Sequence, residues 1–489
     1  MLRCERGCLR SLSDFERGVG GRFITFDRRQ GNDVNKQWKS ILALGLTAAL
    51  GLSACGGGEE PEAEGSASAA PAFSTTASGE LAAWGFDNAD EVGTSRLDYA
   101  EQKLTGVTIK IDATPFDAQK FTTRAASGDM PDAVQMDRQF VATYAAKGLI
   151  KPIDGCFTAH NVDPRAQYYP SVVDDVTYDG QVWGVPQFYQ PPAIMLNKRV
   201  MDAAGVTAAD IDTSKPDVLL AAIGKMYKSS GGNPSTLGLD AQPTGQAGLW
   251  MLGLGGQIIG EDGAPTLDNP NNVKAIDLLK QITDAQGGYA KVKSFTDSFD
   301  FFGKKNQFVE DQVGAEVVPQ WFVNVLSPFA KDVEISAVPF KDASGQPFAV
   351  ASGSAFVIPE KAKNPDAACA WMVNLTSQEA WMAAGAARAK TIEAEGAINT
   401  GLFTGSPAAD QAIRTEYVKP GPNAGFDEAI ATYYDVVAQG KSFGASPAGQ
   451  QIQTELQNAV SSALLGSKPA DVALKDAQDA AMRAYNQAR

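Results

Sequence analysis

The chain is poor in histidine and lacks long apolar runs. Of its 489 residues only one, His160, is a histidine. A single histidine excludes zinc sites built from several histidines and removes the basis for most Ser-His-Asp catalytic arrangements. The longest apolar stretch, 41–54, is roughly 14 residues, shorter than the about 20 that a membrane-spanning helix needs. No internal repeat of about 20 to 50 residues occurs, which excludes a solenoid. These absences direct the interpretation away from hydrolases and toward binding.

Basic charge is also in deficit. The chain carries 42 Lys and Arg against 57 Asp and Glu, a formal net charge of −15. Such an acidic protein repels nucleic acid and anionic lipid, so its partners are expected to be neutral or cationic. Its length exceeds what one hydrophobic core usually supports, and 44% of its residues are hydrophobic. We therefore predict two domains.

The N-terminal region contains the pattern of a lipoprotein signal. Lys36 and Lys39 precede the apolar stretch, which ends in Leu52-Ser53-Ala54-Cys55. The small residues before Cys55 suit a peptidase that cleaves there once the thiol carries a lipid, and the pattern resembles the lipobox of exported bacterial lipoproteins. The alternative is a buried helix that ends in an ordinary cysteine. We expect an extracytoplasmic protein, anchored to the cell membrane by a lipid on Cys55.

This signal divides the first part of the chain. We expect residues 1–33 to precede the true start of translation, 34–54 to be the signal peptide, and the Gly-, Ala-, Ser- and Glu-rich segment 55–78 to be a flexible tether. Cleavage would remove nine basic and five acidic residues and change the net charge from −15 to −19. With Cys55 lipidated, Cys156 and Cys369 remain. We expect two buried free thiols, with a disulfide as the alternative in an oxidising compartment.

The hydrophobic pattern alternates between strands and helices from about residue 81 onward. Short apolar or alternating segments predict strands, and longer periodic segments with Asn-Pro or Ser starts predict helices. The strands are expected at 81–84, 107–111, 133–136, 182–185, 193–196 and 356–358, and the helices at 97–104, 116–126 and after 269, 364 and 377. This alternation predicts an α/β fold with mainly parallel sheets.

Four strings in one order resemble a known family. They are 126–132 (Ala-Ser-Gly-Asp-Met-Pro-Asp), 178–186 with 196–198, 352–359, and 364–365 with 375–380. Together they resemble the family 1 extracellular solute-binding proteins of ABC importers, which are maltose-binding-protein-like. The resemblance covers about residue 80 to the C-terminus.

The resemblance implies a type II fold of two α/β lobes joined by a hinge. It implies lobe I at 79–189 and 352–400 and lobe II at 190–351 and 401–489, with chain crossings near 187–192, 351–354 and 395–405. It further implies that a sugar or similar solute is captured between the lobes and delivered to membrane permease subunits. The protein is then expected to be a monomer without catalytic activity, cofactor or metal.

Sugars present polar hydroxyl groups and apolar C–H faces, so their sites combine planar side chains with hydrogen-bonding groups. On lobe I such residues follow predicted strands, where parallel strands open into a crevice. They are Trp84, Asp87, Asn88, Asp137 and Arg138, of which the last two look like an Asp-Arg pair that contacts sugar in the family. The alternative for Asp137 and Arg138 is a solvated ion pair.

The remaining candidates lie at the crossings and in lobe II. They are Tyr189, Gln190, Ser352 and Gly353 at the crossings, Gln242, Trp250 and Trp321 in lobe II, and Arg388 near the third crossing. Gln190 and Gln242 fall where relatives carry acidic residues, and Arg388 lacks the proline that precedes it in relatives. Trp250 and Trp321 are predicted to stack on the solute, with burial in the core as the alternative. Trp183, Trp371 and Trp381 are assigned to packing.

Three other functions stay open at this point. A surface glycosidase would use two of the many carboxylates, and a retaining pair requires a separation of about 5 Å. The same fold could bind a polyamine, a peptide or a metal chelate, which a cluster of acidic groups in the cleft would favour. A surface adhesin would require repeats or an exposed apolar face, and neither is evident in the sequence.

Overall fold

The computed structural model describes residues 72–86, 88–350 and 352–489. Every element named below belongs to one compact unit, Ala70–Arg489. The predicted lipoprotein signal, Cys55, most of the predicted tether and Asp87 lie outside the described residues.

The described part contains strands in five sheets. The strands are β1 (Gly79–Trp84), β2 (Val107–Asp112), β3 (Ala133–Asp137), β4 (Thr177–Tyr178), β5 (Gln181–Val182), β6 (Val185–Gln187), β7 (Pro192–Asn197), β8 (Lys228–Ser230), β9 (Asn233–Thr236), β10 (Ala315–Pro319), β11 (Ile335–Val338), β12 (Ala349–Val350), β13 (Ser354–Val357) and β14 (Gly440–Lys441). The two largest sheets have the orders β2-β1-β3-β13-β6 and β10-β7-β11.

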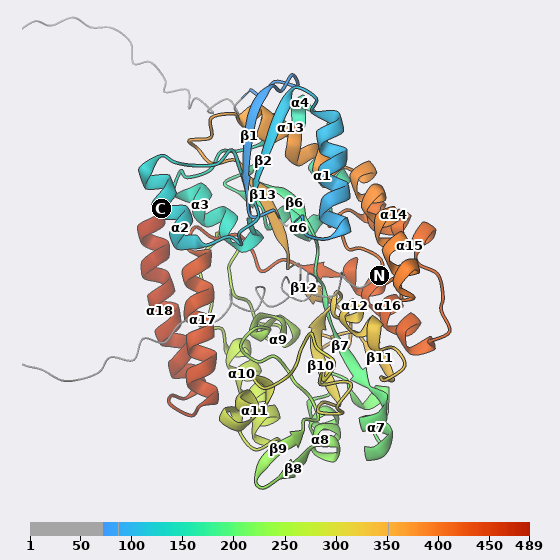
Figure 1. The fold of residues 1–489 in the computed structure, drawn as a ribbon. Helices are drawn as coiled ribbons and strands as arrows, with labels where there is room; N and C mark the ends of the chain where they lie inside the picture. Colours follow the sequence, from blue (N-terminus) through green and yellow to red (C-terminus); the bar gives the residue numbers. More distant parts are fainter. Residues whose placement is uncertain (1–71, 87, 351) are drawn as a thin grey trace, which may run out of the picture. The chain divides into compact units, whose positions relative to one another are not determined.

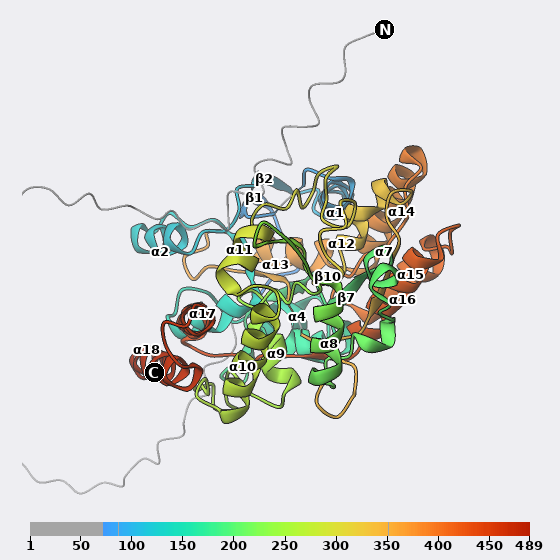
Figure 2. The same cartoon turned by 90° about the horizontal axis from the view of Figure 1, so that it is seen from below.

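Helices surround both of these sheets (Figure 1). They are α1 (Glu91–Lys103), α2 (Ala118–Ser127), α3 (Val141–Ala146), α4 (Asp154–Ala159), α5 (Pro164–Gln167), α6 (Pro170–Asp174), α7 (Lys198–Ala204), α8 (Pro216–Met226), α9 (Ala247–Gly253), α10 (Pro270–Asp284), α11 (Tyr289–Thr296), α12 (Phe322–Leu326), α13 (Pro365–Leu375), α14 (Gln378–Glu395), α15 (Pro407–Tyr417), α16 (Ala424–Val437), α17 (Gly449–Leu464) and α18 (Ala470–Ala488). A short 3-10 helix, η2 (Arg138–Phe140), follows β3. Figures 1 and 2 both show α17 and α18 as an adjacent pair.

We call the part built on the five-stranded sheet lobe I and the part built on the three-stranded sheet lobe II. In lobe I, β1 pairs in parallel with β2 and β3. Strand β13, which comes much later in the chain, lies antiparallel between β3 and β6. The three strands of the lobe II sheet, β10, β7 and β11, are antiparallel. The α/β fold class is confirmed, but antiparallel pairs are more numerous than we predicted because strands from distant segments enter the sheets.

The string 126–132 has a structural explanation. Gly128 ends α2 with φ of 78°, a conformation in which a glycine carries no side-chain strain. Four residues later, the buried Asp132 carboxylate accepts hydrogen bonds from the backbone N–H groups of Ala82, Lys363 and Asn364 at 2.9, 2.8 and 2.7 Å. Asp132 thereby fixes the middle of β1 against the N-terminal end of α13.

Cys156 and Cys369 form a disulfide, so the expectation of two free thiols is wrong. Cys156 lies in α4 and Cys369 in α13, with Cα atoms 5.7 Å apart across a sequence separation of 213. Both residues are fully buried in the core of lobe I. The sequence separation concealed the pairing, because only the packing of α13 against α4 brings the two residues together.

The lobe boundaries stay a prediction. The packing of one helix, α15, differs from the predicted boundaries. We placed residues 401–489 in lobe II, whereas α15 packs against α14, and its residues Ala409 and Ile413 share a buried cluster with Val92 of α1. By contrast, α16 packs on β7 and β11 of lobe II. The third crossing stays a prediction, because Ile398 and Phe403, before α15, share a buried cluster with residues of β7 and α16 in lobe II.

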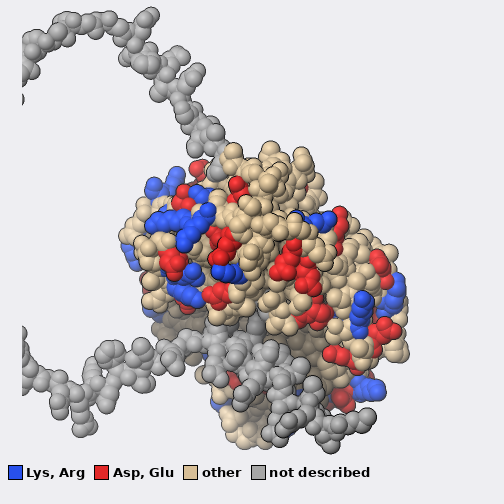
Figure 3. Space-filling model, turned by 45° about the horizontal axis from the view of Figure 1, so that its top comes forward, with Lys and Arg blue, Asp and Glu red and all other residues tan. Residues whose placement is uncertain are grey.

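Surface charge is mixed on the face that Figure 3 shows, where Lys and Arg side chains lie beside Asp and Glu side chains. The excess of acidic residues is thus not gathered there into one patch. Within the described residues, no helix combines the length and the apolar character that crossing a membrane requires.

Candidate functional site

Asp137 is the most accessible of the predicted lobe I residues. It ends β3, and its side chain is exposed to solvent. Desolvation by the surrounding protein nevertheless raises the pKa of this carboxyl, and the positive charge of Arg138 partly offsets the effect. An exposed carboxyl at the end of a lobe I strand is in a suitable position to accept hydrogen bonds from a solute.

Arg138 points away from solvent, with 2% of its side chain exposed. Its Nε donates to Asp175 Oδ2 at 3.2 Å, and its Nη1 donates to the carbonyls of Phe188 and Ser354 at 2.7 and 3.2 Å. These carbonyls belong to the two chain segments that cross between the lobes. Arg138 therefore holds the two crossing segments together. Its buried side chain is neither a solvated ion pair nor positioned to contact a sugar.

The two crossing segments are joined to each other through Gln190 and Ser352. The backbone N–H of Gln190 donates to the Ser352 carbonyl, and the Ser352 hydroxyl donates to the Gln190 carbonyl, both at 2.9 Å. Ser352 is exposed and the Gln190 side chain is half-buried. Gly353 has φ of 150°, and a Cβ there would lie 2.2 Å from the Phe188 carbonyl oxygen. This close approach requires glycine, so Gly353 shapes the crossing.

Three predicted solute residues are buried instead. Trp84 is 1% exposed, donates from Nε1 to Thr114 Oγ1 at 3.2 Å and packs against Phe116. Tyr189 is 0% exposed and packs edge-on against Tyr169. Trp250 is 1% exposed. Burial leaves none of these rings a face for a solute.

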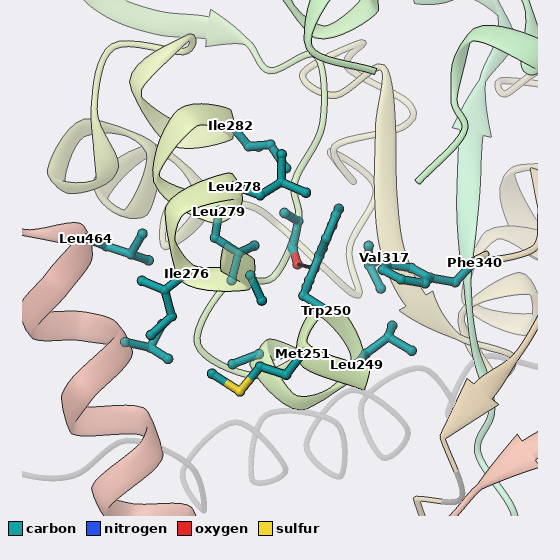
Figure 4. Close-up of a cluster of buried hydrophobic side chains, with 14 of the residues drawn as sticks. Leu249, Trp250, Met251, Ile276, Leu278, Leu279, Ile282, Val317, Phe340 and Leu464 are labelled. Atoms are coloured by element: carbon teal, nitrogen blue, oxygen red, sulfur yellow. Dashed lines mark hydrogen bonds between the residues drawn. The ribbon is translucent and has the colours of Figure 1, made fainter. Parts of the chain in front are cut away.

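Trp250 lies in the core of lobe II, as Figure 4 shows. Its Nε1 donates to the Ala241 carbonyl at 3.0 Å, and Phe340 packs edge-on at a centroid distance of 4.8 Å. The stacking prediction for Trp250 is therefore wrong. Its position in the apolar helix α9 was a signal for burial that the sequence did contain.

Trp321 has the environment that a stacking residue needs. It lies two residues after the end of β10 and is only half-buried. The ring of Phe302 lies nearly parallel to it, with centroids 6.0 Å apart and planes inclined by 13°, and 36% of Phe302 is exposed. We did not predict Phe302. The two adjacent aromatic residues before Gly303 were the available signal.

Gln242 is held by two buried carboxyl groups. Its Nε2 donates to Asp240 Oδ2 at 2.8 Å and to Glu316 Oε1 at 3.3 Å, and its backbone adopts a φ of 47°. Gln307 Nε2 donates to the other Glu316 oxygen at 2.8 Å. Desolvation raises the pKa of Glu316 to about 8 and that of Asp240 to about 6, and the nearby Asp240 charge raises the Glu316 value further. The donor capacity of Gln242 is thus used inside the lobe.

The last two predicted residues lie beside the N-terminus of α1. Arg388 makes ion pairs with Asp90, at 3.2 Å, and with Glu91, and its side chain is 15% exposed. It therefore fixes α14 to α1. Asn88, two residues before Asp90, is half-buried, and its carbonyl accepts from Thr94 Oγ1 at 2.9 Å.

Of the three tryptophans assigned to packing, Trp371 and Trp381 are confirmed at 0% exposure. Trp183 is only half-buried and lines a cavity of about 1350 Å³ between lobe I and lobe II. The cavity is bounded by the β4–β5 hairpin, the loop after α9, the segment 442–447 and the end of α18, and it contains none of the predicted solute residues. It is thus a feature separate from the predicted site.

A family model for the bacterial extracellular solute-binding proteins matches residues 98–401, more than half of the chain. The chain belongs to this family. Membership confirms the solute-binding class and an extracytoplasmic setting that the sequence predicted. No match to a curated protein is found.

Solved structures of solute-binding proteins share the two-lobe fold. An ABC transporter solute-binding protein from Thermotoga lettingae, bound with α-D-tagatose, has 18% identity and a TM-score of 0.63 over 83% of this chain and 99% of its own. An ABC substrate-binding protein from Listeria monocytogenes in complex with cycloalternan has 16% identity and a TM-score of 0.65 over 83% and 98%. The sugar-binding protein MalE from Xanthomonas citri has 15% identity and a TM-score of 0.63 over 83% and 98%. At these identities the likeness establishes the type II fold, whose lobes close on a solute about a hinge.

Proposed function

We propose that this protein captures a sugar or oligosaccharide between its two lobes and delivers it to an ABC importer. The observation that carries the proposal is the aromatic pair of Trp321 and Phe302, partly exposed and nearly parallel at the end of β10. Aromatic faces suit the apolar C–H faces of sugars, and burying one face of a solute on them supplies affinity. The sugars named in the structures of three similar proteins agree with this choice of solute.

Four residues complete the proposed site with hydrogen-bonding groups. Asp137 accepts from hydroxyl groups, and Ser352 and Gln190 present polar side chains at the crossings. Gln242 presents the oxygen of its amide, because its nitrogen is held by carboxyl groups. Asn88 and Asp87 stay predictions. Arg138 and Gly353 hold the crossing segments beside the proposed site, and Arg388 holds α14 against α1.

A cationic solute such as a polyamine is the second candidate, and a peptide the third. A polyamine site needs several accessible carboxylates, whereas Asp137 is the one predicted solute residue among the described residues with an exposed carboxylate. Asp240 and Glu316 are 3% and 0% exposed and are bound to glutamines. The same burial weighs against a glycosidase, since such a pair cannot reach a glycosidic bond.

The test is a titration of residues 70–489, the compact unit that contains every described sheet and the disulfide, followed by tryptophan fluorescence. Maltose, mannobiose, α-D-tagatose and longer oligosaccharides are added beside spermidine, amino acids and short peptides. A saturable response to one sugar class, with the sugar recovered unchanged, supports the proposal. A response to spermidine or peptides alone overturns the choice of solute and leaves the family assignment intact.

We also infer that a lipid on Cys55 tethers the protein to the cell membrane, on the basis of the apolar run and small residues that precede Cys55. Cys55→Ala should release the protein into the soluble extracytoplasmic fraction of the producing cells. Ser66→Ala, in the predicted tether, is the control and should leave the distribution unchanged. If Cys55→Ala and the unchanged protein fractionate alike, the lipid anchor is refuted.

A further inference from the structure

Two buried carboxyl groups lie beside Gln242 in lobe II. Asp240 and Glu316 are paired across adjacent chain segments by an isolated parallel bridge. They are 3% and 0% exposed, so neither carboxyl reaches a solute. Two residues after Asp240, the half-buried Gln242 lies level with the last residues of β10, close to where Trp321 follows the strand. The two carboxyl groups are therefore a second layer of the proposed solute site.

Asp240 holds Gln242 at two points. Its Oδ1 accepts from the Gln242 backbone N–H at 3.0 Å, and its Oδ2 accepts from Gln242 Nε2 at 2.8 Å. The backbone of Gln242 has φ of 47°, a conformation that costs energy for a residue with a side chain and that surrounding contacts must maintain. Asp240 therefore fixes the backbone and the side chain of Gln242 together.

Glu316 adds a second acceptor and connects the pair to the loop that carries Phe302. Its Oε1 accepts from Gln242 Nε2 at 3.3 Å, and its Oε2 accepts from Gln307 Nε2 at 2.8 Å. Gln307 is 0% exposed and belongs to the same loop as Phe302, between α11 and β10. The carboxyl pair thus lies between Gln242 and the loop that supplies an aromatic face to the proposed site.

The amide of Gln242 has one favourable orientation in this environment. An amide has a donor nitrogen and an acceptor oxygen, whereas an ionised carboxylate only accepts. Turning the amide over would place its oxygen against Asp240 Oδ2 and leave both of these acceptors without a donor, at the cost of their desolvation. The nitrogen therefore faces the carboxyl groups, and the amide oxygen is the atom left for a solute.

We propose that Asp240, with Glu316, selects the solute by fixing the Gln242 amide so that only its oxygen faces the site. The site then favours a group that donates at this position, such as a sugar hydroxyl. It disfavours a group that only accepts, such as the fluorine of a deoxyfluoro sugar or the carboxylate of a uronic acid. Asp240 and Glu316 act through Gln242 and are positioning residues. The selectivity rests on the proposed function, whereas the orientation of the amide does not.

The first test needs no solute. Side-chain amide signals of residues 70–489 are recorded by ¹⁵N–¹H NMR, and the Gln242 pair is identified as the one that Gln242→Ala removes. Both protons should lie downfield of a free glutamine side chain and exchange slowly with water, because both are bonded to carboxyl oxygens. Asp240→Asn should move the pair toward the free values. Signals that coincide with free glutamine in the unsubstituted protein, or that Asp240→Asn leaves in place, overturn the proposal.

The second test measures selectivity for whichever of maltose, mannobiose or α-D-tagatose gives a saturable response. Each hydroxyl of that sugar is replaced in turn by fluorine, which cannot donate. One replacement should weaken binding to the unsubstituted protein by about three- to tenfold, the range for one hydrogen bond, and have no effect on Gln242→Ala. In Asp240→Asn the loss at this position should disappear, because the amide is then free to turn its nitrogen toward the fluorine. The losses at the other positions should remain.

Controls separate this role from a general effect on the fold. Asp277→Asn removes an exposed carboxylate from α10 of lobe II and should change neither the Gln242 signals nor the selectivity. A merely structural role of Asp240 would weaken the binding of every analogue equally, and that result contradicts the proposal. If Asp240→Asn does not fold, the signals of the unsubstituted protein decide alone. If none of the sugars binds, the choice of solute fails while the same signals still decide whether the carboxyl pair fixes the amide.

Discussion

At the scale of single residues, environment decides between members of the same residue type. Asp137 and Arg138 are neighbours in the chain, yet Asp137 is exposed and Arg138 is buried among hinge carbonyls. Trp250 and Trp321 were both predicted to stack on the solute, yet Trp250 is in the core and Trp321 is half-buried beside Phe302. Residue type alone made each a reasonable candidate, and the side chain's direction separates them.

Trp321→Ala should weaken solute binding by about 1–3 kcal/mol and leave the fold intact, because it removes a partly exposed aromatic face at the proposed site. Binding is measured by titration and stability by the melting temperature. Trp371→Ala is the matched control. Since Trp371 is 0% exposed and packs against Phe86 and Phe356, its loss should lower the melting temperature instead. Unchanged affinity with a lower melting temperature for Trp321→Ala would assign Trp321 to the core.

At the scale of elements, the positions of strands and helices follow local patterns, and their partners do not. Asn269 and Asn364 cap α10 and α13 as the Asn-Pro pairs predict, each accepting from a backbone N–H in the first turn. Strand β13 belongs to the lobe I sheet, although it follows the strands of lobe II in the sequence. Similarly, the segment 440–449 contacts lobe I, and α17 packs against η2 and α3 of lobe I as well as against α9 and α10 of lobe II.

Gly440→Ala should lower the free energy of unfolding by about 1–3 kcal/mol, the usual range for overpacking a filled site. The new methyl group would meet the hydroxyl of Tyr189, which is 0% exposed and cannot move aside freely. Gly224→Ala is the control, because no atom lies within 4 Å of a Cβ there and α8 is a regular helix. It should be neutral or stabilising. Denaturant unfolding that shows Gly440→Ala to be as stable as the unsubstituted protein would contradict the close approach.

At the scale of the molecule, several acidic side chains are buried in both lobes. Burial raises the pKa of Asp175 to about 6, Asp240 to about 6, Asp410 to about 7 and Glu316 to about 8. In the unfolded chain these groups titrate near 4. The folded state therefore binds protons more tightly than the unfolded state between these values, so stability must fall as pH rises through the folded-state pKa values.

The protein should therefore be more stable at pH 5.5 than at pH 8, by at least about 1.4 kcal/mol, the equivalent of one pKa unit. The lowered pKa of Asp212, about 2, acts only below this window. Glu316→Gln should flatten the upper part of the profile, because the amide cannot ionise. Melting temperatures or denaturant unfolding across pH 5.5–8 provide the measurement. A profile that is flat or rises with pH would refute the burial of these carboxyl groups.

The sequence by itself determined the family, the α/β class, the separation into two lobes and the ends of many helices. These features depend on hydrophobic periodicity, caps and short strings, which are local properties of the chain. The sequence also located Asp137 and Trp321 at strand ends, because a strand end is visible in the pattern.

The tertiary structure alone decided which distant groups meet. Cys156 and Cys369 pair across 213 residues, Arg138 receives Phe188 and Ser354 as partners, and Asp175 meets Ser442. Burial likewise removed Trp84, Tyr189 and Trp250 from the proposed site. The physical reason is that contacts and exposure depend on how elements pack, and packing is a property of the whole fold that no local window of sequence contains.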